Sequence, residues 1–427
     1  MTSDDLPIGR RVARWRVRRS MTQQQLADRL CRSKSWVDKV ERGVRALDRY
    51  SVIQELAEVL RVNPEVLLSP RPQRTPVGTV VGVDDIRAAL ARYDTPPAPE
   101  HTADEARRQV GYAWLTYQHA DYPQLARALP GLLDVVRGAR PLELLVQAYR
   151  IASSLLVKLG VADLGWLAAD RAMAAAGGDP LLSATAVVSI AQALRALNRD
   201  QLALVATGTA ANRILPPPTS THPTPSRPGD HEVGGPCGDH IARQPHDQRG
   251  TGSAGQRAVG QRAVGEWAVG GTLLVQAALA AAGCGEHRRA GELIDQAAGI
   301  AATLRGHDDP HRTSFGPVAV ELARVLVAAQ GGDAAEVVRR HSTVVRREGW
   351  RRLPAEYRGA YLLDVARAYH RVGDLRGAAR ALVDADHVAP AEVRCRPLAR
   401  TVIADLARVR PAPAGVTRLA AVVGLTR

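Results

Sequence analysis

The sequence predicts an all-α protein in which a small N-terminal helical bundle precedes a long series of paired helices. Aromatic residues make up only 4% of the 427 residues, whereas hydrophobic residues make up 45%. A core built mainly from Ala, Leu and Val favours closely packed helices over a β-sandwich. Apolar residues also recur at helical spacing along most of the chain, with breaks at Gly, Asn or Pro. A chain of this length has room for two or three domains.

Residues 1–69 carry the start and stop signals of five short helices. Thr22 and Gln25 have the spacing of a capping box at the start of the second helix, and Ser33 and Gly43 can begin and end the third. The inward faces hold apolar residues at helical spacing: Ile8, Val12 and Trp15, then Leu26, Ala27 and Leu30, then Val37 and Val40, then residues 52–60 and 64–68. Each helix is too short to be stable alone, so these faces must meet in one compact bundle.

This arrangement resembles the helix-turn-helix domain of the Xre/Cro-type repressor family over residues 8–68. The family pattern is Thr-Gln, Leu-Ala, a turn, Ser, two apolar positions and Glu-x-Gly. It is present here as Thr22-Gln23, Leu26-Ala27, Ser33, Val37, Val40, Glu41 and Gly43. One departure is Cys31, which stands in the turn where the family usually has glycine. Its side chain costs strain if the backbone there has a positive φ.

The resemblance implies that the third helix enters the major groove of double-stranded DNA while the second crosses the sugar-phosphate backbone. Side chains at the outward positions would then contact DNA: Gln23, Ser33, Lys34, Ser35, Trp36, Asp38, Lys39 and Arg14. A lysine can donate to guanine O6 and N7, and a serine can contact either kind of base. The phosphate contact typical of the family falls on Gln23, and Arg14 could add another.

Two points stay open in this region. Trp36 fits contact with a thymine methyl or sugar edge, and it equally fits packing on a neighbouring helix. The basic face as a whole is also compatible with a solvated surface, or with a domain that has lost DNA binding. The core pattern and the outward basic residues agree with each other, and this agreement favours DNA binding.

Past residue 69 the chain changes character. Residues 70–101 are rich in proline and predict a linker with one short helix. Residues 102–427 read as helix after helix, and the segment 362–390 fits the spacing of a tetratricopeptide repeat. Its matching positions are Leu362, Val365-Ala366, Tyr369, Gly373-Asp374, Ala378, Leu382 and Pro390, and weaker copies of the turn occur at Gly160, Asn198, Gly285 and Gly332. This part of the chain resembles a tetratricopeptide-like α-solenoid.

Residues 216–271 interrupt the helical pattern. The stretch contains a proline-rich run and the tandem pentapeptide GQRAVGQRAVGEWAVGG. Its composition predicts a disordered insertion between two repeats, without a packed core. A frameshifted reading of GC-rich DNA is an alternative explanation, because helical periodicity returns abruptly at Thr272.

No pattern in the sequence predicts a metal site, a cofactor or an enzyme. The four cysteines are scattered without a CxxC pair, and two clusters rich in histidine fit a low-complexity segment and an inter-repeat loop better than a metal site. These clusters are His231, Cys237, His240 and His246, and His307, Asp308, Asp309 and His311. The sequence has no Gly-rich phosphate loop, no GxSxG and no recognisable carboxylate pair.

The charge and the absence of targeting signals indicate a cytoplasmic protein whose partner is a polyanion. The formal net charge of +14 points to nucleic acid before an anionic membrane. Arginine far outnumbers lysine, which is typical of a GC-rich genome, so the charge alone decides little. The N-terminus lacks an apolar signal core, and no run of 18 apolar residues suggests a membrane span.

Two functions fit these observations. The first is a sequence-specific DNA-binding transcriptional regulator whose repeat domain senses a ligand or peptide, dimerises, or does both. The combination of domains resembles the peptide-responsive regulators of Gram-positive bacteria, which implies a homodimer and a peptide or small-molecule effector. The second is a protein-interaction scaffold with a vestigial helix-turn-helix. The retained Lys34, Ser35 and Lys39 favour the first.

Overall fold

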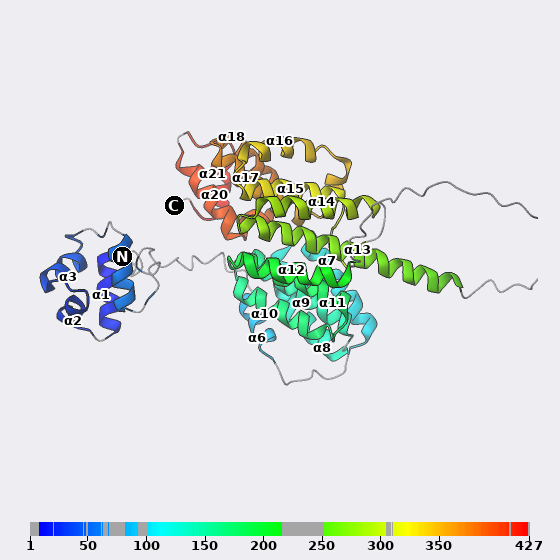
Figure 1. Ribbon diagram of the computed structural model, residues 1–427, viewed down its shortest axis with the longest axis horizontal. Coiled ribbons are helices and arrows are strands. Elements are labelled where there is room, and N and C mark those ends of the chain that lie inside the picture. Colours follow the sequence, from blue (N-terminus) through cyan, green and yellow to red (C-terminus); the bar gives the residue numbers. More distant parts are fainter. Residues whose placement is uncertain are drawn as a thin grey trace, which may run out of the picture. The chain divides into compact units, whose positions relative to one another are not determined.

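The computed structural model divides the chain into two compact units, Met1–Thr79 and Val80–Arg427. It describes residues 8–19, 21–45, 47, 50–60, 62, 67, 82–92, 101–139, 141–215, 252–304, 309, 311–409 and 411–425. Within these ranges all the regular secondary structure is helical (Figure 1). The predicted all-α fold is therefore confirmed.

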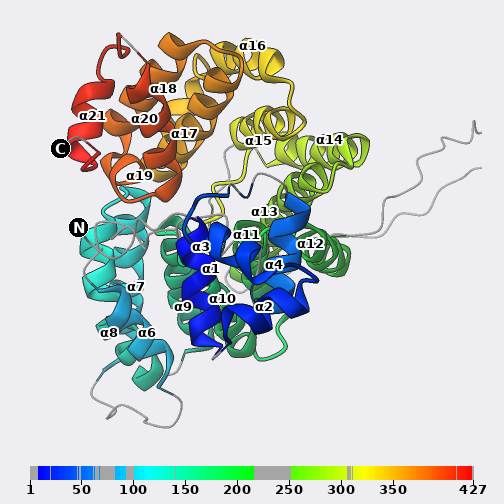
Figure 2. The same cartoon turned by 90° about the vertical axis from the view of Figure 1, so that its left-hand side faces the viewer.

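The N-terminal unit is a small helical bundle (Figure 2). Its helices are α1 (Ile8–Arg18), α2 (Gln23–Arg29), α3 (Lys34–Glu41) and α4 (Tyr50–Leu60). The core is formed by Val12, Leu26, Ala27, Leu30, Val37, Ile53, Leu56, Ala57, Leu60 and Leu67. The fifth helix, predicted at residues 64–68, lies outside the described residues except for Leu67, which is fully buried.

The local signals of the second and third helices are confirmed. Thr22 Oγ1 accepts from the backbone N–H of Gln25 at 3.1 Å, and Gln25 Oε1 accepts from the Thr22 N–H at 2.8 Å, which completes the capping box. Ser33 Oγ caps α3 by accepting from the Trp36 N–H at 3.1 Å. Cys31, in the turn between the helices, has a φ of 51°. Its side chain therefore stands where glycine would be unstrained.

Helix α1 packs closely against the end of α3, and Gly9 makes this approach possible. A Cβ atom at Gly9 would lie 1.9 Å from the carbonyl oxygen of Val40. No side chain can occupy that space, because the obstacle is backbone. A glycine in the first turn of α1 therefore fixes the position of α3 in the bundle.

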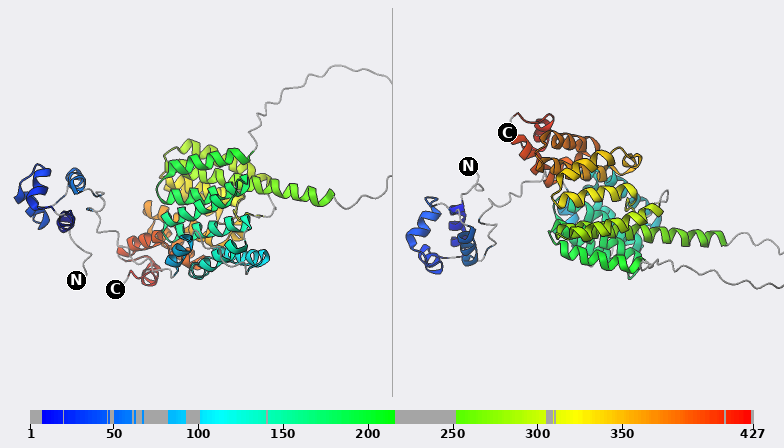
Figure 3. Two further views of the ribbon diagram at one scale, coloured as in Figure 1. Left: turned by 90° about the horizontal axis from the view of Figure 1, so that it is seen from below. Right: turned by 45° about the horizontal axis from the view of Figure 1, so that its top comes forward.

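The second unit begins with a short helix and continues as a series of helix pairs (Figure 3). The pairs are α7 (Ala103–Gln118) with α8 (Tyr122–Ala139), α9 (Leu142–Lys158) with α10 (Ala162–Ala175), α11 (Pro180–Ala196) with α12 (Asp200–Ile214), α13 (Gly252–Gly283) with α14 (His287–Thr303), α15 (Pro317–Gln330) with α16 (Ala334–Val344), and α17 (Ala355–Arg371) with α18 (Leu375–Val388). A 3-10 helix, η1 (Glu348–Arg352), precedes α17, and α19 (Pro390–Arg394), α20 (Pro397–Arg408) and α21 (Val416–Val422) end the unit. The predicted α-solenoid is confirmed.

The same backbone motif joins the two helices of every pair. Each turn contains one residue in the left-handed region: Ala120, Gly160, Asn198, Gly285, Gly332 and Gly373. The N–H of the next residue donates to the carbonyl five positions back, as from Asp374 to Tyr369 at 3.0 Å. This bond is the hallmark of a Schellman motif, which ends a helix and reverses the chain. The predicted turns stand where the sequence placed them.

The pair α17–α18 has the packing that the repeat pattern predicts. The small residues Ala366 and Ala378 are fully buried, and the large Leu382 is fully buried between the helices. Leu362 and Val365 complete the inner face of α17. Small residues where two helices touch, with one large residue filling the remaining space, give this pair a dense core.

The predicted disordered insertion at residues 216–271 is wrong over its last part. Helix α13 extends back to residue 252, and Val269 is fully buried. The glycines that suggested disorder instead allow neighbours to approach the helix. A Cβ at Gly271 would lie 2.1 Å from the ring of Phe315, so this glycine makes room for the aromatic side chain. The earlier residues of the predicted insertion lie outside the described ranges.

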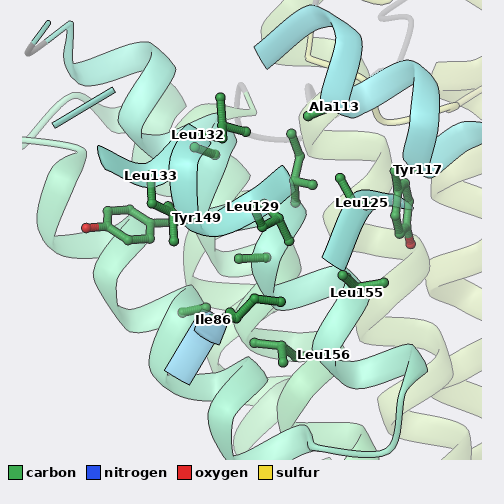
Figure 4. Close-up of a cluster of buried hydrophobic side chains, with 14 of the residues drawn as sticks. Ile86, Ala113, Tyr117, Leu125, Leu129, Leu132, Leu133, Tyr149, Leu155 and Leu156 are labelled. Atoms are coloured by element: carbon green, nitrogen blue, oxygen red, sulfur yellow. The ribbon is translucent and has the colours of Figure 1, made fainter. Parts of the chain in front are cut away.

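The short helix predicted within residues 70–101 is present as α6 (Val83–Leu90), but it belongs to the second unit and not to a linker. Ile86, Ala89 and Leu90 are buried and join the same hydrophobic cluster as the leucines of α8 (Figure 4). The cluster explains why this segment is fixed to the repeats, because α6 packs against α8 and also contacts α10.

One stretch of α13, Ala263–Gly283, is long and apolar enough to cross a membrane. However, 78% of its most apolar window is buried inside the unit. A core helix of a folded domain passes the same test, so this stretch is weak evidence for a membrane span.

Candidate nucleic-acid interface and repeat-domain cavity

Helix α3 presents polar and basic side chains to solvent and apolar ones to the core. Lys34, Ser35 and Lys39 are exposed, whereas Val37 and Val40 are buried. The two lysines are five positions apart, which places them about 140° apart around the helix axis. The two side chains therefore leave the helix in different directions.

The other predicted contacts on α3 are partly engaged within the protein. Ser33 Oγ is used as the helix cap. Trp36 is half-buried and packs against the core, while its ring also lies 5.8 Å from the guanidinium carbon of Arg32. Half-buried Asp38 accepts from Arg42 at 3.3 Å. Trp36 therefore packs against the core, as one of its two interpretations requires, and remains partly exposed.

Gln23 is tied to a buried carboxylate. Its side-chain nitrogen donates to Glu41 Oε2 at 2.9 Å. Glu41, which is 5% exposed, also accepts two bonds from Arg16, at 2.6 Å and 3.0 Å. The bond to Glu41 raises the pKa of Arg16 although burial opposes it. This network links α1, α2 and α3, and it holds the start of α2 in a fixed position relative to α3.

The sequence did not assign this role to Glu41, which entered only as part of the Glu-x-Gly signature. The signal was an acidic residue placed one position after the inward-facing Val40. Arg14 is exposed on α1, as the prediction requires, and so are Arg10 and Arg18. The structure thus brings Gln23 into a structural network and leaves Lys34, Ser35, Lys39 and Arg14 available to a partner.

A family model described as a helix-turn-helix domain matches residues 7–69 of this chain. Together with the described helices α1 to α4, this match identifies the N-terminal unit as a helix-turn-helix domain. No curated protein matches the sequence. Among solved structures, the chain has a distant likeness to Bacillus thuringiensis PlcR in complex with the peptide PapR7 and DNA, with 9% identity, a TM-score of 0.33, and coverage of 89% of this chain and 94% of that one. A likeness at this level supports no conclusion about function.

Outside the helix-turn-helix domain, the repeat unit contains a cavity of about 690 Å³ that is partly open to solvent. Its walls come from α7, α9, α11, α13, α15 and α17 together with the segment 312–315. Apolar and aromatic residues form part of the lining, among them Trp114, Val275, Leu279, Phe315 and Tyr361. A concave space lined by apolar side chains with a few converging polar groups is the usual form of a ligand site.

The cavity wall carries an excess of positive charge. Seven basic side chains line it, against three carboxylates. Two of the arginines are strongly desolvated: burial lowers the pKa of Arg150 to about 10, and burial also lowers the pKa of Arg195. Neither arginine was singled out from the sequence.

A cluster of buried charges closes the solenoid next to this cavity. Lys158, at the end of α9, donates to Glu356 at 2.5 Å and to Glu392 at 2.7 Å. Glu392 also accepts from Arg396 at 2.7 Å and from the hydroxyl of Tyr122. The cluster therefore bonds the first helix pairs of the unit to its last helices, across more than two hundred positions of sequence.

Within the described residues, no group of three or more His, Cys, Asp or Glu side chains could hold a metal ion. Asp309, part of one predicted histidine-rich cluster, instead accepts from the backbone N–H groups of Thr313 and Ser314 at 3.0 Å and 2.6 Å. This carboxylate thus organises the loop before α15, as expected for an inter-repeat connection. His307 and Asp308 lie outside the described residues.

Proposed function

We propose that this protein is a sequence-specific transcriptional regulator that reads DNA with α3 and responds to an effector through its repeat unit. The helix-turn-helix domain supports the first part, because this motif places its second helix in the major groove. The observation that carries the proposal is the exposed trio Lys34, Ser35 and Lys39 on a helix whose position is fixed from behind by Gly9 and Glu41.

The roles of individual side chains follow from their exposure. We assign base contacts to Lys34 and Ser35, and a base or phosphate contact to Lys39. Arg14 would contact phosphate from α1. Ser33, Trp36 and Asp38 have partners within the protein, so their contribution would come through exposed atoms at the edge of the interface. Only one of the two amide N–H groups of Gln23 is used in its bond to Glu41, so the second can donate to a phosphate oxygen without loss of that bond.

The effector part of the proposal rests on the cavity. A space of about 690 Å³ with aromatic and charged lining suits a short peptide or a small molecule. We further propose that the regulator acts as a homodimer in the cytoplasm. The two helix-turn-helix domains of a dimer would bind two half-sites about one helical turn apart. Because the domains are linked, the dimer binds DNA more tightly than one domain does, without new contacts.

The scaffold alternative predicts no sequence preference on DNA, so one experiment separates the two functions. Genomic fragments are captured on the tagged full-length protein and sequenced, and we expect a small set of sites that share a two-part motif. Two charge-reversed variants are run in parallel: Lys34→Glu, on α3, and Arg288→Glu, on the exposed side of α14.

Both variants change the net charge equally, so a purely electrostatic loss would affect them alike. We expect Lys34→Glu to abolish the enriched motif and Arg288→Glu to preserve it. Fragments without a common motif, or equal losses in both variants, would favour the scaffold.

A further inference from the structure

Arg150 is a buried cation that forms no ion pair with a carboxylate of the described residues, although Asp309 favours its charged form from a distance. It lies on α9, is 4% exposed and lines the cavity. Its Nη2 donates to the backbone carbonyl of His311 at 3.1 Å, and its guanidinium lies 5.4 Å from the centre of the Trp114 ring. Its Nε finds no hydrogen-bond partner in the described part of the chain.

Arg195, on α11, lines the same cavity and is half-buried. Its Nη1 donates to the neutral Gln276 at 3.0 Å, while its buried Nε has no partner among the described residues. A buried guanidinium without a counter-charge costs stability, because its hydration is lost and not replaced. The cavity wall thus carries one buried and one half-buried guanidinium, neither of which has an ion-pair partner among the described residues.

The carboxylates of the cavity wall do not supply the missing charge. Glu356 is bound to Lys158 at 2.5 Å, and Asp364 lies 3.7 Å from Arg367. Asp200, the third carboxylate, and Asp364 both favour the charged form of Arg195 from a distance, but neither forms an ion pair with it. Within the described chain, the nearest charge partners are thus committed elsewhere or too far away.

We propose that the cavity binds an organic anion whose carboxylate or phosphate oxygens pair with Arg150 and Arg195, while its apolar part packs on the aromatic lining. A guanidinium presents a planar fork of donors that matches such oxyanions, and the low dielectric of a buried site strengthens the pairing. The inference rests on the proposed effector role and names the chemical class of the effector.

The geometry also indicates how binding of the anion would affect other helices of the unit. The carbonyl that holds Arg150 belongs to the segment just before α15, where Arg312 and Ser314 have left-handed backbones with φ of 55° and 54°. The same segment places Phe315 against Gly271 of α13. An anion paired with Arg150 therefore adds a partner to a group that already anchors this segment.

The test measures thermal unfolding of the full-length protein and of three variants: Arg150→Met, Arg195→Met and, as a control, Arg352→Met, whose side chain is 78% exposed. Methionine keeps much of the length of arginine without its charge. Without added anion, we expect both cavity variants to melt close to the wild-type temperature, because removal of a charge without an ion-pair partner offsets the lost hydrogen bond to His311 or Gln276. A loss of several degrees would mean that the arginines hold the fold, and would overturn the proposal.

The second measurement adds citrate or pyrophosphate, with sodium chloride at the same ionic strength as the reference. We expect the wild type and Arg352→Met to gain about 2–4 °C when either anion is well above its dissociation constant. Arg150→Met and Arg195→Met should lose most of this gain. Such anions also stabilise proteins by exclusion from their surface, so an equal gain in all four proteins overturns the proposal. So does the absence of any gain in the wild type.

A last arm distinguishes the source of the anion. Mixed random hexapeptides are added with free or with amidated C-termini. A larger gain with the free carboxylates, lost in Arg150→Met, identifies a peptide terminus as the ligand group. A gain with citrate or pyrophosphate alone identifies a small anion. None of these measurements involves DNA, so their failure would leave the proposed DNA binding untouched.

Discussion

Removal of the charge of Glu392 should destabilise the repeat unit more than any surface charge change. Glu392 is fully buried in α19 and accepts from Lys158 and Arg396, each at 2.7 Å, and from Tyr122. Burial alone raises the pKa of Glu392, but the two cations more than compensate, so its pKa lies below the ordinary value and the group is ionised at neutral pH.

The variant Glu392→Gln keeps the shape of the side chain and removes its charge. Lys158 retains Glu356 as a partner, but Arg396 loses the only carboxylate within ion-pair distance in the described chain. Removing one partner of a buried ion pair costs about 3–5 kcal/mol. Glutamine can still accept one hydrogen bond, so we expect the lower end, about 3 kcal/mol.

Urea unfolding of the full chain, followed by circular dichroism, gives the change in the free energy of unfolding. Hydrogen exchange shows which helices are destabilised. Backbone amides of α8 and α19 should exchange faster, because Glu392 on α19 bonds to Tyr122 at the start of α8. Glu348→Gln is the control, since Glu348 and its partner Arg352 are 83% and 78% exposed and such a pair contributes little. If both variants unfold alike, the buried cluster does not stabilise the closure of the solenoid, and the reasoning is refuted.

Three other predictions concern the helix-turn-helix domain and the pH dependence of stability. Gly9→Ala should destabilise the N-terminal unit by about 1–3 kcal/mol and weaken DNA binding, because its Cβ would lie 1.9 Å from the carbonyl oxygen of Val40. Gly111→Ala is the control, since a Cβ at Gly111 on α7 has no neighbour within 4 Å. Urea unfolding and DNA titration measure both variants. Lys34→Ala should cost about 1–3 kcal/mol on the operator and relax preference at one base pair, while Arg14→Ala should weaken all sequences alike and reduce the salt slope by about one; equal losses for Lys34→Ala on operator and scrambled DNA would contradict its base contact. Burial lowers the pKa of His341 from 6.5 to about 4, so the unfolded chain binds more protons between these values. Stability should fall as the pH drops from 6.5 towards 4, by at most about 3 kcal/mol, and the pH profile of His341→Gln should lack this component.

The elements that the sequence predicted well are those with local causes. The capping box of Thr22 and Gln25 and the left-handed turn at Gly373 involve residues within a few positions of each other. Their hydrogen bonds form inside one turn of chain, so residue type and spacing are enough to predict them. The same is true of the helical periodicity that gave the solenoid.

The start of α13 was missed because glycine is compatible with two opposite structures, a disordered segment and a closely packed helix. In isolation, a run of glycines loses the most entropy on folding and favours disorder. Next to Phe315, however, Gly271 is the residue that leaves space for the ring, and burial of its neighbours compensates for the entropy. Which meaning applies depends on a side chain more than forty positions away, and composition contains no information about it.

Arginine shows most clearly why the candidate sites could be predicted only in part. Arg14 and Arg16 stand two positions apart on one helix, yet Arg14 is exposed and Arg16 is bound to a buried glutamate. Arg150 stands in an apolar helical pattern, where a single arginine reads as a surface residue that extends to solvent, but it is buried beside a cavity. In a chain with 57 basic residues, residue type cannot separate these three roles. Periodicity finds the face of a helix, and only the packing of distant helices decides whether that face meets water, a carboxylate or a space that a ligand can fill.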